Sequence, residues 1–248
     1  MNPRTRVRRL VLALAAVLCF TAVVLAVPPD EPEPRLQSFP WMSLESWQMR
    51  HQRNLDRKAQ GPIDLLFLGD SITEGWGGNA VWREHYQPRN AANFGIGGDT
   101  TQEVLWRITE GGELEGISPK VTVLLIGTNN LWRDNASPAD IARGVKKICS
   151  TIREKLPATK LLVMAVFPLN ERPDHPARAS VAGINTILAA LDDGSNVRFL
   201  DIGPGLTQSD GVISKEVMPD YLHLSEHGYR IWADQMNPLL LEMMGEGK

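Results

Sequence analysis

The sequence of 248 residues contains little cysteine, since only Cys19 and Cys149 occur. Two thiols cannot build a disulfide-stapled scaffold or a cysteine-rich zinc module, so both classes are excluded. A surplus of positive charge is also missing, because 26 Lys and Arg face 29 Asp and Glu and the formal net charge is −3. Bulk electrostatics therefore predict no nucleic-acid partner. The apolar fraction of 43% and the charged fraction of 22% are typical of a globular domain and exclude wholesale disorder.

The first 26 residues form a segment of their own. Basic residues, all of them arginine, precede an apolar run from Leu10 to Val27, and residues 1–26 contain no acidic side chain. This order is typical of a secretory signal, with a cut expected after Ala26. The run is also close to the minimum length of a membrane span, so 1–26 is either a cleaved signal peptide or a retained N-terminal anchor. Either alternative predicts an exported protein that is secreted, periplasmic or in the cell envelope. Contact with a membrane is expected only through residues 1–26, and only if they are not cleaved.

The next segment, 27–35, reads VPPDEPEPR. Its prolines and acids cannot form a core, and they favour an extended spacer. We therefore predict a Pro-rich linker at 27–35 and one folded domain over 36–248, in which we find no internal repeat.

Short apolar runs alternate with amphipathic stretches along that domain. The runs are nearly continuous, as in strands that a parallel sheet buries on both faces; they lie at 63–68, 91–94 (the weakest), 120–126, 160–166 and 197–200. Apolar residues at helical spacing predict helices at 100–109, 137–156, 177–191 and 225–244, and Pro238 is expected to bend or interrupt the last one. The alternation predicts a three-layer α/β/α sandwich, whose ligand site lies beyond the carboxyl ends of the strands.

Polar residues that follow these strands have the types that acyl transfer needs. Ser71 stands at a strand-to-helix turn, where its hydroxyl and its own N–H point into the cleft. The glycines of 95–98 free a backbone N–H, and the amide of Asn129 can donate to a developing oxyanion. Asp220 precedes His223 by three residues, so its carboxylate can orient the imidazole. Each block alone has a plain interpretation as a turn, a cap or a strand end, but together they supply a nucleophile, a base, an orienting acid and three donors.

These blocks, with the segment from Ala92 to Arg107, resemble those of the SGNH hydrolases, also called the GDSL lipase/esterase family. Within that family the chain is similar to the catalytic subunits of intracellular platelet-activating factor acetylhydrolase. The resemblance implies a flavodoxin-like, five-stranded parallel sheet, the SGNH hydrolase fold, without metal or cofactor. It implies a catalytic triad and an oxyanion hole; the triad is Ser71, Asp220 and His223, and the hole is made by Ser71, Gly98 and Asn129.

The resemblance also implies a serine esterase that cleaves short-chain, above all acetyl, esters through an acyl-serine intermediate. Since the acetylhydrolase subunits are cytosolic and this chain carries an export signal, the expected partner is an acetylated carbohydrate or a small lipid or alcohol ester. An O-acetyltransferase acting on glycans and a noncatalytic glycan-binding domain of the same fold stay open as alternatives. A homodimer, as the acetylhydrolase subunits form, stays open too, because no motif marks an interface.

Several predictions concern the surroundings of the site. Residues that flank the strand ends are expected to wall the substrate pocket; they are Trp76, Leu131, Trp132, Phe167 and Leu222. Trp41 and Trp47 are expected to pack in the core, and Asp70 to brace the turn before Ser71. His227 follows His223 at a helical spacing that can bind zinc, but no third ligand is evident, so no metal site is expected.

Overall fold

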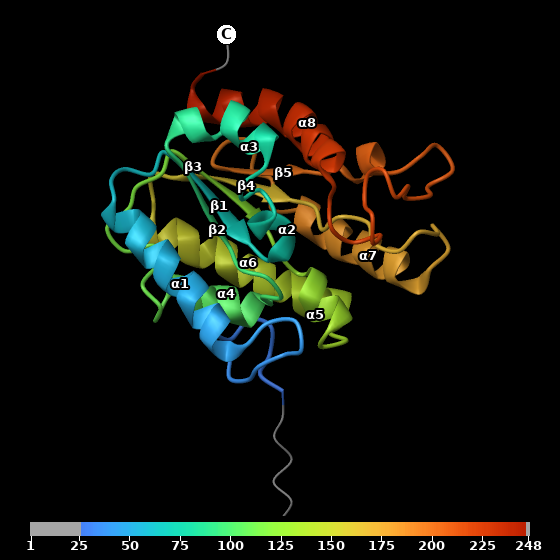
Figure 1. The fold of residues 1–248 in the computed structure, drawn as a ribbon, viewed down its shortest axis with the longest axis horizontal. Coiled ribbons are helices and arrows are strands. Elements are labelled where there is room, and N and C mark those ends of the chain that lie inside the picture. Colours follow the sequence, from blue (N-terminus) through green and yellow to red (C-terminus); the bar gives the residue numbers. More distant parts are fainter. Residues whose placement is uncertain (1–25, 247–248) are drawn as a thin grey trace, which may run out of the picture.

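The computed structural model describes residues 26–246 of the chain (Figure 1). The segment predicted to be a signal peptide or anchor, 1–26, lies outside this range except for Ala26. Between residues 26 and 246, no helix is both long enough and apolar enough to cross a bilayer.

Five strands form one parallel sheet in the order β2-β1-β3-β4-β5. Their bounds are Leu65–Gly69 for β1, Ala91–Gly95 for β2, Val121–Leu125 for β3, Lys160–Met164 for β4 and Val197–Leu200 for β5. Every residue of β1 and β3 is buried, which is why nearly continuous apolar runs mark these strands in the sequence. The register pairs Gly69 with Gly95 and with Leu125, so the central strands end at one common edge. The predicted fold class is confirmed.

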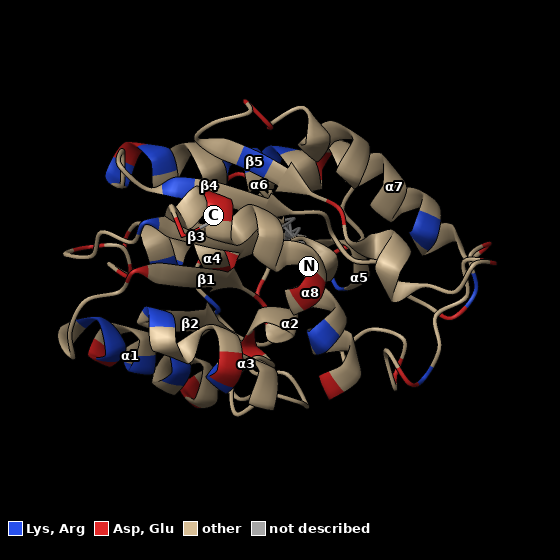
Figure 2. Ribbon diagram, turned by 90° about the horizontal axis from the view of Figure 1, so that it is seen from above, with Lys and Arg blue, Asp and Glu red and all other residues tan. Residues whose placement is uncertain are grey.

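Helices cover both faces of this sheet, and charged residues lie mainly on the helices and loops (Figures 1 and 2). Alternate residues of β1 enter different cores, Leu66 and Leu68 on one side and Leu65 and Phe67 on the other. The first core contains side chains of α4 (Thr101–Ile108), α6 (Pro138–Lys155) and α7 (Pro176–Ala189). The second contains side chains of α2 (Ser71–Glu74), α3 (Ala80–His85) and α8 (Glu226–Met244). Short α5 (Thr128–Trp132) follows β3.

Two features of the helices differ from the sequence-based expectation. Helix α1, Leu44–Ala59, was not predicted, because few of its residues are apolar and only Trp47 and Asn54 of the helix are buried. Helix α8 continues through Pro238 without the predicted interruption. Its buried side chains, among them Trp232 and Met236, hold the helix on the sheet, and this tertiary packing outweighs the backbone hydrogen bond that proline removes.

The segment 27–35 also differs from the predicted spacer, because it packs along α4. The N–H of Glu33 donates to the carbonyl of Gln102 at 3.1 Å, and the Gln102 side chain donates to the carbonyl of Val27 at 3.0 Å. Arg35 is only 4% exposed. Hydrogen bonds and ion pairs attach this proline-rich segment, and Pro29 and Arg35 are buried, so the folded domain begins before the predicted boundary at residue 36.

Candidate active site

Ser71 is the first residue of α2 and comes directly after Asp70, at the carboxyl edge of β1. The Asp70 carboxylate caps the helix by accepting a hydrogen bond from the N–H of Ile72 at 3.0 Å. Asp70 is fully buried, and this burial raises its pKa to about 7, although the Ile72 N–H opposes the shift. Asp70 thus braces the turn that carries Ser71, in agreement with its expected role.

Ser71, His223 and Asp220 lie in one hydrogen-bonded chain. The Oγ of Ser71 lies 2.9 Å from Nε2 of His223, and Nδ1 of His223 lies 2.7 Å from Oδ2 of Asp220. The other Asp220 oxygen accepts from the backbone N–H of His223 at 2.7 Å and of Leu222 at 3.1 Å. Tyr221 between them has a φ of 60°, a strained backbone for a non-glycine residue. The structure therefore brings these three predicted site residues together, although 152 positions separate Ser71 from His223.

The side chains of His223 and Asp220 in this hydrogen-bonded series are accessible to solvent. The side chains of His223 and Asp220 are 44% and 56% exposed. Partial burial would raise the pKa of Asp220, but hydrogen bonds from the His223 ring and backbone outweigh it and lower that pKa below its usual range. Asp220 is therefore ionised at neutral pH and able to orient the imidazole.

The glycine-rich loop after β2 lies beside Ser71. A β carbon placed on Gly97 would lie 3.8 Å from the β carbon of Ser71. Gly98 has a φ of +74°, and a β carbon there would lie 2.0 Å from the Trp41 ring. Only glycine fits at position 98, because the backbone there is left-handed and because the Trp41 ring occupies the space that a β carbon would need.

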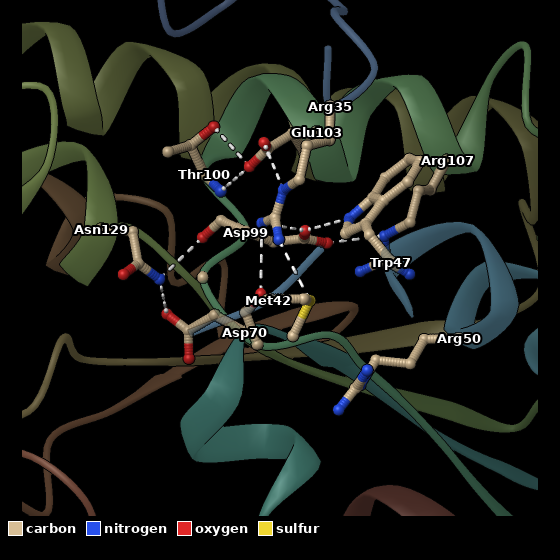
Figure 3. A network of polar contacts seen from close by, with 12 residues as sticks. Arg35, Met42, Trp47, Arg50, Asp70, Asp99, Thr100, Glu103, Arg107 and Asn129 are labelled. Carbon is tan, nitrogen blue, oxygen red and sulfur yellow. Dashed lines mark hydrogen bonds and ion pairs between the residues drawn. The ribbon is translucent and has the colours of Figure 1, made fainter. Parts of the chain in front are cut away.

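Asn129, in the first turn of α5, links the two parts of the site. Its Nδ2 donates to the carbonyl of Asp99 at 2.9 Å and to Oδ2 of Asp70 at 3.3 Å (Figure 3). The amide therefore lies between the turn that carries Ser71 and the loop that carries Gly98. All five predicted catalytic and oxyanion residues thus come from segments that meet at one edge of the sheet.

A buried cluster of ion pairs anchors the end of the glycine-rich loop at Asp99 (Figure 3). One oxygen of Asp99 accepts from Nε of Arg107 at 2.8 Å, and the other accepts from the Trp47 indole at 2.7 Å and from Arg35 at 3.2 Å. Arg107 also pairs with Glu113. Burial raises the pKa of Asp99 to about 7, while the guanidinium groups of Arg107 and Arg35 oppose the shift. The residue next to Gly98 is thereby anchored inside the molecule.

Two predicted pocket residues belong to the core instead. Trp76 is 0% exposed, and its ring centroid lies 4.5 Å from Tyr229 and 4.9 Å from Trp232. Phe167 is 2% exposed and lies 4.9 Å from Trp232. The prediction that Trp76 and Phe167 line the substrate pocket is therefore wrong, because both side chains turn toward α8.

The other predicted pocket residues stay near the surface. Leu131 and Leu222 are partly buried against the core, and Trp132 on α5 is 64% exposed. Trp47 is buried as predicted, but Trp41 is 47% exposed and stacks on Phe39 with ring centroids 5.0 Å apart. The position of Trp41 beside Gly98 was not predicted, since an isolated Trp next to a proline-rich segment belongs to no periodic pattern that would indicate its neighbours.

Metal ligation finds no support in the part of the chain that the structure describes. Within residues 26–246, no group of three or more His, Cys, Asp or Glu could hold a metal ion. The polar groups that the described residues bring together at this site are a hydroxyl, an imidazole, a carboxylate and an amide.

A hydroxyl, an imidazole and a carboxylate in line at the carboxyl edge of a parallel three-layer sheet define the class of α/β ester hydrolases. Residues 67–231 match the model of the GDSL-like lipase/acylhydrolase family. The chain belongs to this family and is an ester hydrolase.

Known relatives agree with this assignment. The chain is 40% identical over 204 residues to platelet-activating factor acetylhydrolase IB subunit alpha2 of Rattus norvegicus, across 82% of this chain and 86% of the rat protein. It is 38% identical over 207 residues to subunit alpha1 of Homo sapiens, across 83% of this chain and 85% of the human protein.

Solved structures share the fold. A GDSL-like lipase from Bacteroides thetaiotaomicron superposes with a TM-score of 0.64 at 18% identity, over 77% of this chain and 97% of that protein. A variant of an acetylxylan esterase from Geobacillus stearothermophilus gives a TM-score of 0.54 at 20% identity, over 73% and 93%. At these identities the likeness concerns the fold alone.

Proposed function

We propose that the protein is a serine esterase that removes short acyl groups, acetyl above all, through an acyl-Ser71 intermediate. The observation that carries this proposal is the chain from Ser71 Oγ to His223 Nε2 at 2.9 Å and from His223 Nδ1 to Asp220 at 2.7 Å. A neighbouring imidazole can activate a serine hydroxyl at neutral pH by accepting its proton.

In the first step, His223 Nε2 accepts the proton of Ser71 as Oγ attacks the ester carbonyl. Asp220 fixes the His223 tautomer through Nδ1 and stabilises the imidazolium that forms. His223 then gives its proton to the leaving alcohol, which departs and leaves an acyl-serine. Water attacks this ester by the same route, and Ser71 is released with its proton.

The tetrahedral intermediate carries a negative charge that needs donors. The N–H groups of Ser71 and Gly98 and the amide of Asn129 supply them in the proposed oxyanion hole. The 3.3 Å bond from Asn129 to Asp70 is the longer of its two, and it is the one that an oxyanion would replace. Loss of one such donor typically costs about 3 kcal/mol of transition-state stabilisation.

An acetylated carbohydrate is the substrate class that we favour. The relatives are named acetylhydrolases, and one fold neighbour is an acetylxylan esterase, so acetyl esters recur among similar proteins. The half-exposed Trp41 ring beside Gly98 offers a flat apolar surface to the group that carries the ester. The basic and apolar residues of 1–26 support export of the protein to a place where glycans are accessible. Cell fractionation, with an N-terminal analysis of the mature chain, tests this location.

The decisive test compares Ser71→Ala with wild type on p-nitrophenyl acetate. We expect Ser71→Ala to lose nearly all turnover while its melting temperature stays unchanged, and Ser150→Ala, an exposed serine on α6, to keep full activity. Retained turnover in Ser71→Ala would overturn the proposal. Across a series of p-nitrophenyl esters the enzyme should favour acetyl, and a preference for dodecanoyl would contradict the proposed preference for short acyl groups.

The natural acyl carrier is identified by product analysis. The chain without residues 1–26 is offered acetylated sugars and a short-chain phospholipid, with and without a glycan acceptor. Free acetate from the sugars supports the esterase, whereas transfer of acetyl to the acceptor would show an O-acetyltransferase. Size-exclusion chromatography with light scattering on the same sample tests the homodimer.

A further inference from the structure

Both ends of residue Gly97 are held by charged side chains. Its N–H donates to Oε2 of Glu74 at 2.8 Å, and the other oxygen of Glu74 accepts from Nε of Arg50 at 2.6 Å. Its carbonyl accepts from Nη2 of Arg35 at 3.1 Å. Glu74 belongs to the same short helix as Ser71, so Gly97 is fixed relative to the hydroxyl on one side and to Arg35 on the other.

The carbonyl of Gly97 and the N–H of Gly98 belong to one planar peptide group. The described residues contain no cis peptide bond, so in this group the C=O and the N–H point in opposite directions. A guanidinium that fixes the direction of the carbonyl therefore also fixes the direction of the N–H. Arg133 holds the next peptide in the same way, by donating to the Gly98 carbonyl at 3.1 Å.

We propose that Arg35 is a positioning residue that aims the Gly98 N–H at the oxyanion. The inference rests on the proposed function, because it assigns a task to a residue outside the hydroxyl–imidazole–carboxylate chain. Arg35 lies upstream of the family match at 67–231, in the proline-rich segment. That segment is thus part of the active site and not a tether.

Arginine suits this position better than lysine. Its guanidinium is buried and donates to Glu103 at 3.1 Å, to Asp99 at 3.2 Å and to Gly97, each in a different direction (Figure 3). The same group lies 5.5 Å from the centroid of the Trp41 ring. A planar fork can make these contacts at once, whereas the single ammonium of lysine cannot meet all of them.

A merely structural role for Arg35 would be to attach residues 27–35 to the domain. Arg143 provides the matched control. Its Nε pairs with Asp30 of the same segment at 3.0 Å, and within residues 26–246 its hydrogen bonds and ion pairs go to Asp30 and Asp140 and not to the glycine loop. If attachment is what matters, loss of either arginine should have the same consequence. If aiming of the Gly98 N–H is what matters, only Arg35 should affect the chemical step.

The experiment uses the full chain and the variants Arg35→Ala, Arg35→Lys and Arg143→Ala. The concentration of competent sites is counted by fluorophosphonate titration, and kcat per counted site and KM are measured on p-nitrophenyl acetate. Affinity for phenylboronic acid, whose tetrahedral serine adduct resembles the intermediate, is measured alongside. We expect Arg35→Ala to lower kcat per site about 10- to 100-fold with little change in KM, and to weaken boronate binding by a similar factor.

The controls separate aiming from folding. We expect Arg35→Lys to recover part of the lost kcat, and Arg143→Ala to keep kcat per site within about twofold of wild type. An unchanged kcat per site in Arg35→Ala or Arg35→Lys, or an equal loss in Arg143→Ala, would overturn the inference. None of these results touches the proposed function, which the Ser71→Ala variant tests separately.

Discussion

The two halves of the site are built in opposite ways. The half that carries the predicted oxyanion donors is anchored by Asp99, Arg107 and Glu113, whose side chains are 0% exposed. The half that carries the proposed base lies on a surface loop, where, among residues 26–246, Asp220 accepts hydrogen bonds from Leu222 and His223 alone. We therefore expect activity and stability to be coupled in the donor half and separable in the base half.

The largest effect on activity is expected in the base half, from Asp220→Asn. Without the carboxylate, the His223 tautomer and the imidazolium lose their support, and kcat should fall about 10⁴-fold. Because this pair is exposed, the melting temperature should change little. Steady-state kinetics and a melting curve on the same sample check both halves of the expectation. A variant that melts far below wild type would show that the base half is not separable.

The largest effect on stability is expected in the donor half, from Arg107→Met. This change removes the buried cation that the carboxylates of Asp99 and Glu113 share and leaves Asp99 paired with Arg35, which should lower the free energy of unfolding by about 3–5 kcal/mol. Urea denaturation measures the loss. Arg230→Met, which removes an exposed pair with Glu84, is the control and should change stability little. Equal losses in the two variants would contradict the role given to the buried cluster.

Some parts of the fold and site can be predicted from the sequence and others cannot. Strands appear as apolar runs, and Ser71, Asn129 and His223 follow local motifs, so their places are predictable from short stretches of sequence. Arg35 and Trp41 contact partners far along the chain. The proline-rich composition around Arg35 predicts a spacer, and Trp41 was predicted to pack in the core.

The direction in which a side chain points is a second feature that the sequence does not predict. Trp76 and Phe167 flank strand ends in the sequence, as pocket residues do, but packing against Trp232 turns them into the core. Helix α1 escapes prediction because few of its residues are buried, and α8 tolerates Pro238 because its buried face holds it in place. Each of these outcomes is decided by tertiary contacts that no local window of residues contains.

Gly98→Ala tests the donor half at its centre. The added methyl group meets the Trp41 ring, and alanine disfavours a φ of +74°, so the N–H should be displaced and kcat should fall about 100-fold. Gly116→Ala is the matched control, since Gly116 has a φ of +76° but open space around its α carbon. The double variant Gly98→Ala/Trp41→Ala should recover part of the loss in kcat; a recovery to wild-type kcat would mean that backbone conformation plays no part.

The pH dependence of stability gives a smaller and more specific test. Burial raises the pKa of Asp70 to about 7, so the folded protein binds this proton more tightly than the unfolded chain does, whose carboxyl has a pKa of about 4. Ionisation of Asp70 therefore lowers stability as the pH rises from about 4 through 7. Asp70→Asn lacks this loss, so its melting temperature relative to wild type should rise between pH 5 and pH 8. A difference that stays constant with pH would contradict the buried, protonatable carboxyl.

The smallest effect is expected from Trp41→Phe, which keeps the stack on Phe39 but shortens the exposed ring. KM for an acetylated sugar should rise about two- to fivefold, with little change in kcat or melting temperature. Met49→Ala, a change at an exposed apolar residue of α1, is the control. An unchanged KM would remove Trp41 from the substrate surface.

Stoichiometric labelling with a fluorophosphonate, followed by peptide mapping, tests the acyl-serine chemistry most directly. The account predicts one adduct, on Ser71, with esterase activity lost in proportion to the labelled fraction and with labelling greatly slowed in His223→Ala. Full turnover after complete labelling of Ser71, or an adduct on another residue that accounts for the loss of activity, would contradict it.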